Sequence, residues 1–156
     1  MKCNNPFFIA GVLSLAVFIL WSCVLQAEPK KSVRNVLILN SYHPTFLWTE
    51  RINKSIRSTF KQAGLQVNYY SEYLDTKRFS PETYSRSHLQ LFEKKYRNES
   101  FDLIISSDNN ALDFLLQYRS RLFPGVPVVF CGYNNFSDSI LAGQSAITGV
   151  VEEIDI

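Results

Sequence analysis

Residues 34–40 read RNVLILN, an almost uninterrupted apolar run with polar ends. Such a run predicts a β-strand that is buried on both faces, as strands of parallel sheets are. From Trp48 to Phe60 an apolar residue then recurs at every fourth position, which predicts a helix that ends near Gly64. A buried strand followed by a helix is the repeating unit of an α/β protein with a parallel sheet.

The same alternation continues along the rest of the chain. Further strands are predicted over residues 66–74, 102–106, 126–130 and 146–151, and helices over 81–97, 109–119 and 137–142. Ser80 and Pro81 are typical of a helix start, as the N-cap and the first helical residue. Because crossovers between parallel strands are right-handed, this pattern favours a doubly wound parallel five-stranded sheet in the order 2-1-3-4-5.

Residues 1–27 differ from the rest of the chain and form a leader. Within it, Phe7–Leu25 contains no charged side chain and is close to the roughly 20 residues that an apolar helix needs to span a bilayer. Three outcomes stay open: an uncleaved N-terminal hydrophobic helix in the membrane, cleavage after Ala27, or a lipid on Cys23. All three place residues 28–156 outside the cytoplasm, on the periplasmic side of the inner membrane.

The composition argues against several classes of function. The chain has 16 basic and 14 acidic side chains, so its net charge of +2 gives no reason to expect nucleic acid as a partner. Cys131 is the one cysteine outside the leader, so no internal disulfide is expected. The two histidines, His43 and His88, lack partners at metal-ligand spacing, and no glycine-rich phosphate loop occurs. We therefore expect neither a metal nor a cofactor.

Small polar and aromatic residues follow each predicted strand. The carboxyl ends of parallel strands lie on one edge of a sheet, and ligands of such sheets bind beyond that edge. This mixture of hydroxyl, amide and aromatic groups is typical of a cleft for a small molecule. The candidate ligand-binding residues are Ser41, Tyr42, His43, Asp75, Ser107, Asp108, Asn109, Gly132, Tyr133 and Asn134.

Several of these candidates also have a structural interpretation. Asp108 or Asn109 is expected to cap the helix that follows, and the other is then free to contact a ligand. Tyr133 follows a glycine in a predicted loop, which favours it as a residue that stacks on a ligand. Cys131, His43 and Asp108 could instead be a nucleophile, a base and an orienting group, which leaves an exported α/β hydrolase as one alternative function.

Five separated segments, in the same order, resemble the ABC-transporter substrate-binding-like family that occurs as extracytoplasmic sensor regions. They read SYHPTFLWTERI (41–52), EYLDTKRFSPE (72–82), DLIISSDNNALDFLLQYR (102–119), LFPGVPVVFCGYNNF (122–136) and TGVVEEIDI (148–156). The resemblance covers about residues 33–156. It implies two lobes of the type I periplasmic-binding-protein kind, with a small-molecule ligand held between them.

The resemblance also implies a place in a larger protein. Members of the family commonly precede membrane-bound histidine kinases or diguanylate cyclases. We expect residues 28–32 to be a linker and residues 33–156 to be the first lobe, with the second lobe and any signalling module lying beyond this chain. By itself this lobe is not expected to be an enzyme. A substrate-binding protein or lipoprotein of an ABC transporter is the other alternative.

Overall fold

The computed structural model describes residues 32–152. The predictions for the leader, including its hydrophobic helix, and for most of the linker fall outside the described residues. The elements, in chain order, are β1 Arg34–Asn40, α2 Leu47–Gln62, β2 Val67–Tyr73, α3 Pro81–Lys95, β3 Leu103–Ser107, α4 Asn109–Leu122, β4 Val128–Asn134, the 3₁₀ helix η1 Asp138–Leu141 and β5 Ile147–Glu152. Between residues 32 and 152 no helix is both long and apolar enough to cross a bilayer.

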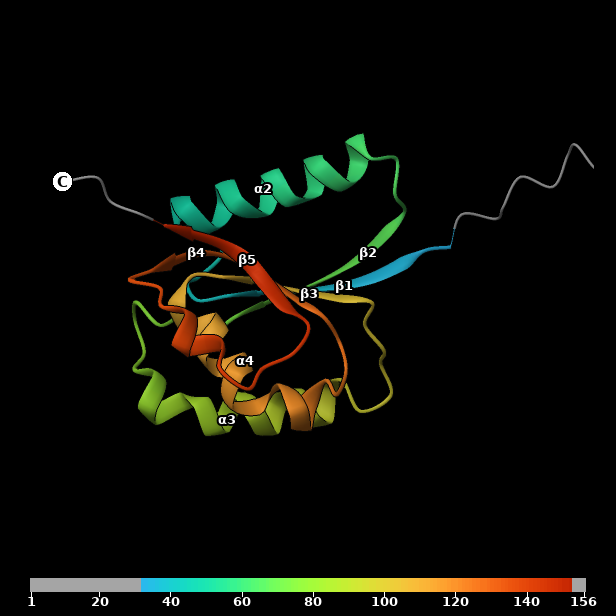
Figure 1. Ribbon diagram of the computed structural model, residues 1–156. Coiled ribbons are helices and arrows are strands. Elements are labelled where there is room, and N and C mark those ends of the chain that lie inside the picture. Colours follow the sequence, from blue (N-terminus) through green and yellow to red (C-terminus); the bar gives the residue numbers. More distant parts are fainter. Residues whose placement is uncertain (1–31, 153–156) are drawn as a thin grey trace, which may run out of the picture. The chain divides into compact units, whose positions relative to one another are not determined.

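The five strands form one sheet in the order β2-β1-β3-β4-β5, and every neighbouring pair is parallel. Helix α2 lies against one face of this sheet, and α3 and α4 lie against the other (Figure 1). The predicted α/β class, the strand order and the helices on both faces are therefore confirmed. This arrangement brings the carboxyl ends of all five strands to one edge.

Strand β4 differs from the prediction. It begins at Val128 and runs to Asn134, so residues 131–134 lie within the strand and not in a loop after it. Gly132 adopts a φ of 71°, which allows a bulge at which the ladder with β5 shifts and then resumes at Tyr133. The expectation that Tyr133 sits in a loop is wrong for this reason. The other elements match the prediction to within a few residues.

The two faces of the sheet are packed unequally. On the α3 and α4 face a large cluster surrounds Leu37 and Leu39 of β1, and it includes Phe92, Leu112 and Leu115 from the helices. On the other face Val36, Ile38 and Ile105 form a smaller cluster, against which Ile56 and Phe60 of α2 pack. Successive residues of β1 thus point to opposite faces and are buried on both, as the sequence predicts.

Candidate ligand-binding site

The carboxyl rim is the edge of the sheet formed by residues 40–43, 74–77, 107–110 and 132–135. Backbone hydrogen bonds join its segments: the Ser41 N–H donates to the Ser107 carbonyl over 3.1 Å, and the Asp108 N–H donates to the Cys131 carbonyl over 2.8 Å. The Leu74 N–H donates to the Asn40 carbonyl over 2.9 Å. All ten candidate residues therefore lie on or directly beside one edge, although they come from four separate parts of the chain.

Ser41 is the centre of the hydrogen bonding at the rim. Its hydroxyl donates to the Ser107 carbonyl over 2.8 Å and accepts from the Ala111 N–H of α4 over 2.9 Å. Its carbonyl accepts from both the N–H and the hydroxyl of Thr76, each over 2.9 Å. Ser41 is only 1% exposed, so it ties β1, β3, α4 and the loop after β2 together.

Asn109 and Asn134 join the start of α4 to the end of β4. The Asn109 side chain donates to the Asn134 carbonyl over 3.1 Å and accepts from the Asn134 N–H over 2.9 Å. These two hydrogen bonds pair with the N–H and the carbonyl of Asn134 as a neighbouring strand would, so both backbone groups are satisfied. The amide of Asn109 is therefore committed to the fold.

The carboxyl rim contains three non-glycine residues with a positive φ. Asp75, Asp108 and Asn135 have φ values of 57°, 75° and 56°. Within the described residues only one further non-glycine residue, Ala146, has a positive φ, and it precedes β5 at the opposite edge. Such conformations cost about 1–3 kcal/mol each and gather at functional sites, where the surrounding structure holds them.

Asp108 has two partners at the rim. Its carboxylate accepts from the Asn109 N–H over 2.9 Å, so the prediction that one of these two residues caps α4 is confirmed. The same carboxylate faces the hydroxyl of Tyr42. Burial of this hydroxyl, followed by the negative charges of Asp108 and Glu152, raises the pKa of Tyr42 well above its usual value. The Tyr42 hydroxyl therefore stays protonated.

An aromatic and cationic group lies beside this carboxylate. The rings of Tyr42 and Phe46 meet edge to face with centroids 4.9 Å apart, and the Lys77 ammonium lies 4.6 Å from the Tyr42 centroid. The neighbouring Arg78 pairs with Asp75 over 2.5 Å. No ion pair within residues 32–152 involves Lys77. The rim thus presents a buried carboxylate, a tyrosine face and an exposed ammonium together.

Trp48 of α2 lies next to the carboxyl rim. Its indole ring lies directly against Gly132, where an added Cβ would come within 2.9 Å of the ring. Its Nε1–H is buried and has no hydrogen-bond partner in the described part of the chain. Gly132 itself is the only sequence signal for this close approach, and it does not identify Trp48 as the partner.

Tyr133 does not occupy the position of a residue that stacks on a ligand at the rim. The Tyr133 ring is 8% exposed and packs among Phe130 and Phe136, while its hydroxyl donates to the Asp113 carboxylate over 3.1 Å. A ring nitrogen of His43 lies 3.0 Å from the Thr45 hydroxyl. The fold thus turns Tyr133 inward and leaves Tyr42 as the aromatic face at the rim.

Cys131 lies in a setting that disfavours the thiolate. Its Sγ is 3.6 Å from the Ser106 carbonyl oxygen, to which the thiol donates. Burial raises the pKa of the Cys131 thiol, and the nearby Asp108 charge adds to this effect. The thiol is therefore protonated at neutral pH, whereas a cysteine nucleophile reacts as the thiolate.

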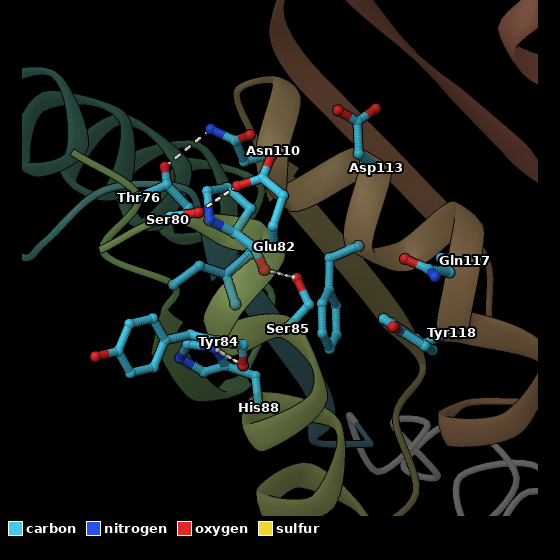
Figure 2. A pocket seen from close by; sticks show the side chains of 13 residues that line it. Thr76, Ser80, Glu82, Tyr84, Ser85, His88, Asn110, Asp113, Gln117 and Tyr118 are labelled. Atoms are coloured by element: carbon cyan, nitrogen blue, oxygen red, sulfur yellow. Dashed lines mark hydrogen bonds between the residues drawn. The ribbon is translucent and has the colours of Figure 1, made fainter. Parts of the chain in front are cut away.

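A cavity of about 350 Å³ lies on the flank of the domain, between the first halves of α3 and α4 (Figure 2). It contains none of the ten candidate residues. It meets the carboxyl rim at Thr76 and Asn110, which are joined by a hydrogen bond of 2.9 Å from the Asn110 side chain. The sequence signal for its α4 wall is the polar series Asn110, Asp113 and Gln117 at helical spacing.

Within residues 32–152 no group of three histidine, cysteine, aspartate or glutamate side chains is placed to hold a metal ion. No protein-family model matches the chain, and no curated protein matches it.

Proposed function

We propose that this chain is the first lobe of an extracytoplasmic small-molecule-binding sensor region, in which the carboxyl rim forms one wall of the ligand cleft. The lobe is one half of a two-lobed periplasmic-binding-protein-like fold. It is attached to the membrane through residues 7–25 and serves as the input region of a histidine kinase or a diguanylate cyclase. The leader and the five resembling segments support this assignment.

The single observation that supports the binding role is that positive-φ residues and buried polar side chains gather at the carboxyl rim. Asp75, Asp108 and Asn135 hold positive φ values there, beside the exposed Lys77 and the Tyr42 ring. Positive-φ residues cost folding free energy, and packing alone gives no reason for them to gather at one edge of the sheet. A ligand-binding surface whose backbone is fixed before the ligand arrives gives such a reason.

An open part of the sheet supports the view that the lobe has further structure around it. Val151 packs into the core on the α3 and α4 face, so its neighbour Val150 points to the face of α2. Val150 is 69% exposed. Parallel sheets are usually covered on both faces, and at β5 this cover is missing from the described residues.

Ligand binding would then act by closing the lobes. Residues at the carboxyl rim contact the ligand from one side and the second lobe contacts it from the other, so the ligand favours the closed conformation. A change in the closed population is a signal that a membrane-attached receptor can transmit.

The test compares two aspartate-to-asparagine variants. Asp108→Asn keeps a side chain that tolerates a positive φ and can still accept from the Asn109 N–H, but it removes the charge. Asp102→Asn makes the same change at the opposite edge. We expect a compound from a panel of amino acids, monosaccharides and short carboxylic acids to raise the melting temperature of the 156-residue chain in nonionic detergent.

The rise in melting temperature should shrink in Asp108→Asn and persist in Asp102→Asn. If a compound raises the melting temperature and both variants keep the full rise, the carboxyl rim is not the binding wall for that ligand.

A further inference from the structure

Helix α2 carries an excess of positive charge. It holds four of the sixteen basic side chains of the chain, Arg51, Lys54, Arg57 and Lys61, and one of its fourteen acidic ones, Glu50. The rest of the chain is therefore slightly negative, although the whole has a net charge of +2. The small net charge hides a local concentration of positive charge on one helix.

Most of this charge lies on the side of α2 that faces away from the sheet. Ile56 and Phe60 pack against the sheet, so residues about half a turn around the helix point outward. These residues are exposed, and no described element covers them in Figure 1. They form the outward side of α2, which consists of Leu47, Arg51, Lys54, Ser58 and Lys61.

The charges on the outward side are not neutralised by the described part of the protein. No ion pair within residues 32–152 involves Arg51, Lys54 or Lys61. Arg57 differs from them, because its guanidinium lies over the Tyr69 ring, 4.2 Å from the centroid. Three positive charges on one exposed helical stripe are therefore available to an anionic surface.

The end of α2 lies near the point where the chain leads back to the leader. The Arg34 N–H, at the start of β1, donates to the Gln66 carbonyl, just after α2, over 2.9 Å. Eight residues, 26–33, separate Leu25 at the end of the apolar stretch from Arg34, and two of them are lysines. Even when fully extended, this segment spans at most roughly 30 Å. A leader held in a bilayer would thus keep α2 within reach of the lipid headgroups.

We propose that the outward side of α2 lies against a bilayer that contains anionic phospholipids. Basic side chains are attracted to such a surface within about one Debye length. Three charges alone bind weakly, but attachment through the leader makes the contact intramolecular and raises its effective concentration. The same reason favours the membrane over an acidic protein, which would bind without a tether. This contact rests on the membrane attachment proposed above and adds to it the surface of the lobe that meets the lipid.

The test measures which face of the lobe approaches the headgroups. The ¹⁵N-labelled 156-residue chain is inserted into nanodiscs of phosphatidylcholine, with or without phosphatidylglycerol, that contain a gadolinium-chelating lipid. Gadolinium weakens the NMR signals of nearby amides. Ser58 on the outward side of α2 is compared with Ser87, an exposed serine of α3 on the other face of the sheet. We expect the Ser58 signal to lose intensity in the anionic discs and to recover at high salt, and the Ser87 signal to persist.

Charge-removing variants identify the side chains responsible. Arg51→Gln/Lys54→Gln should restore the Ser58 signal in the anionic discs, because the attraction to the headgroups is reduced. Arg86→Gln/Lys94→Gln removes one arginine and one lysine from α3 as the matched control and should respond like the wild type. All four side chains are exposed and form no ion pair within residues 32–152, so the fold is retained.

The outcomes separate this contact from the membrane attachment on which it rests. A chain that does not co-purify with the discs contradicts the attachment and the contact together. An inserted chain in which Ser58 and Ser87 respond equally, or in which Ser58 responds equally in both kinds of disc, contradicts the α2 contact alone. Poly-glutamate that shifts the Ser58 signal while the anionic discs leave its intensity unchanged would assign this face to an acidic protein instead.

Discussion

The two edges of the sheet use similar polar residues in opposite ways. The amino rim is formed by residues 33–35, 100–102, 124–127 and 145–146. There Asp102 pairs with Arg34 over 2.9 Å, and the Arg34 and Asp102 side chains are 56% and 39% exposed. At the carboxyl rim Ser41, Ser107 and Asp108 are buried and bonded to one another's segments. The amino rim is a solvated boundary, whereas the carboxyl rim is buried and cross-linked by hydrogen bonds.

Two glycines with nearly the same φ provide the largest test of this difference. Gly132 at the carboxyl rim has a φ of 71° and faces Trp48, while Gly125 at the amino rim has a φ of 76° and has nothing within 4 Å of an added Cβ. Gly125→Ala should lower the free energy of unfolding by about 1 kcal/mol through backbone strain alone. Gly132→Ala should lower it by about 2–4 kcal/mol, because the Cβ also collides with the indole ring.

Urea denaturation of both variants measures the two values. Equal losses would mean that the Trp48 ring moves aside at little cost, and that the carboxyl rim is less rigid than its hydrogen bonds indicate.

A pair of serines gives the next largest effect. Ser41→Ala leaves the buried Ala111 N–H without its acceptor, and this should lower the free energy of unfolding by about 2 kcal/mol. Ser100→Ala, at the exposed amino rim, removes a hydroxyl from solvent and should change it by less than about 0.5 kcal/mol. Chemical denaturation followed by circular dichroism measures both free energies of unfolding. An equal decrease in Ser100→Ala and Ser41→Ala would contradict the difference between the two rims.

The smallest expected effects lie at the two ends of the pH scale. Hydrogen bonds from the Asn35 N–H and from Arg34 lower the pKa of Asp102, so its stabilising contribution is present above the unfolded pKa and is lost as the pH falls. Burial and Asp108 raise the pKa of Tyr42, so its contribution is present below about pH 10 and is lost as the pH rises further.

These two contributions are measured as urea midpoints against pH. Asp102→Asn should flatten the acid side of the profile and leave the alkaline side unchanged, and Tyr42→Phe should do the reverse. A change on the same side in both variants would contradict the assignment of one titrating group to each rim.

Local signals in the sequence were enough to determine the fold class and much of the framework. The apolar run of β1, the fourth-residue spacing of α2 and the Ser80–Pro81 helix start each depend on residues within one or two turns of each other. The strand order followed because right-handed crossovers leave few ways to join such units. The capping role of Asp108 is local as well, since its partner is the next residue.

Contacts between distant residues were decided by the tertiary structure alone. Tyr133 turns inward because the bulge at Gly132 keeps it in β4, where its hydroxyl reaches Asp113 on α4. The Trp48 ring of α2 packs against Gly132 of β4, and the cavity between α3 and α4 exists only because these two helices lie side by side. Periodicity and capping report the conformation of a short segment, but which side chains meet depends on how whole elements pack, and this is determined by the summed burial of many residues.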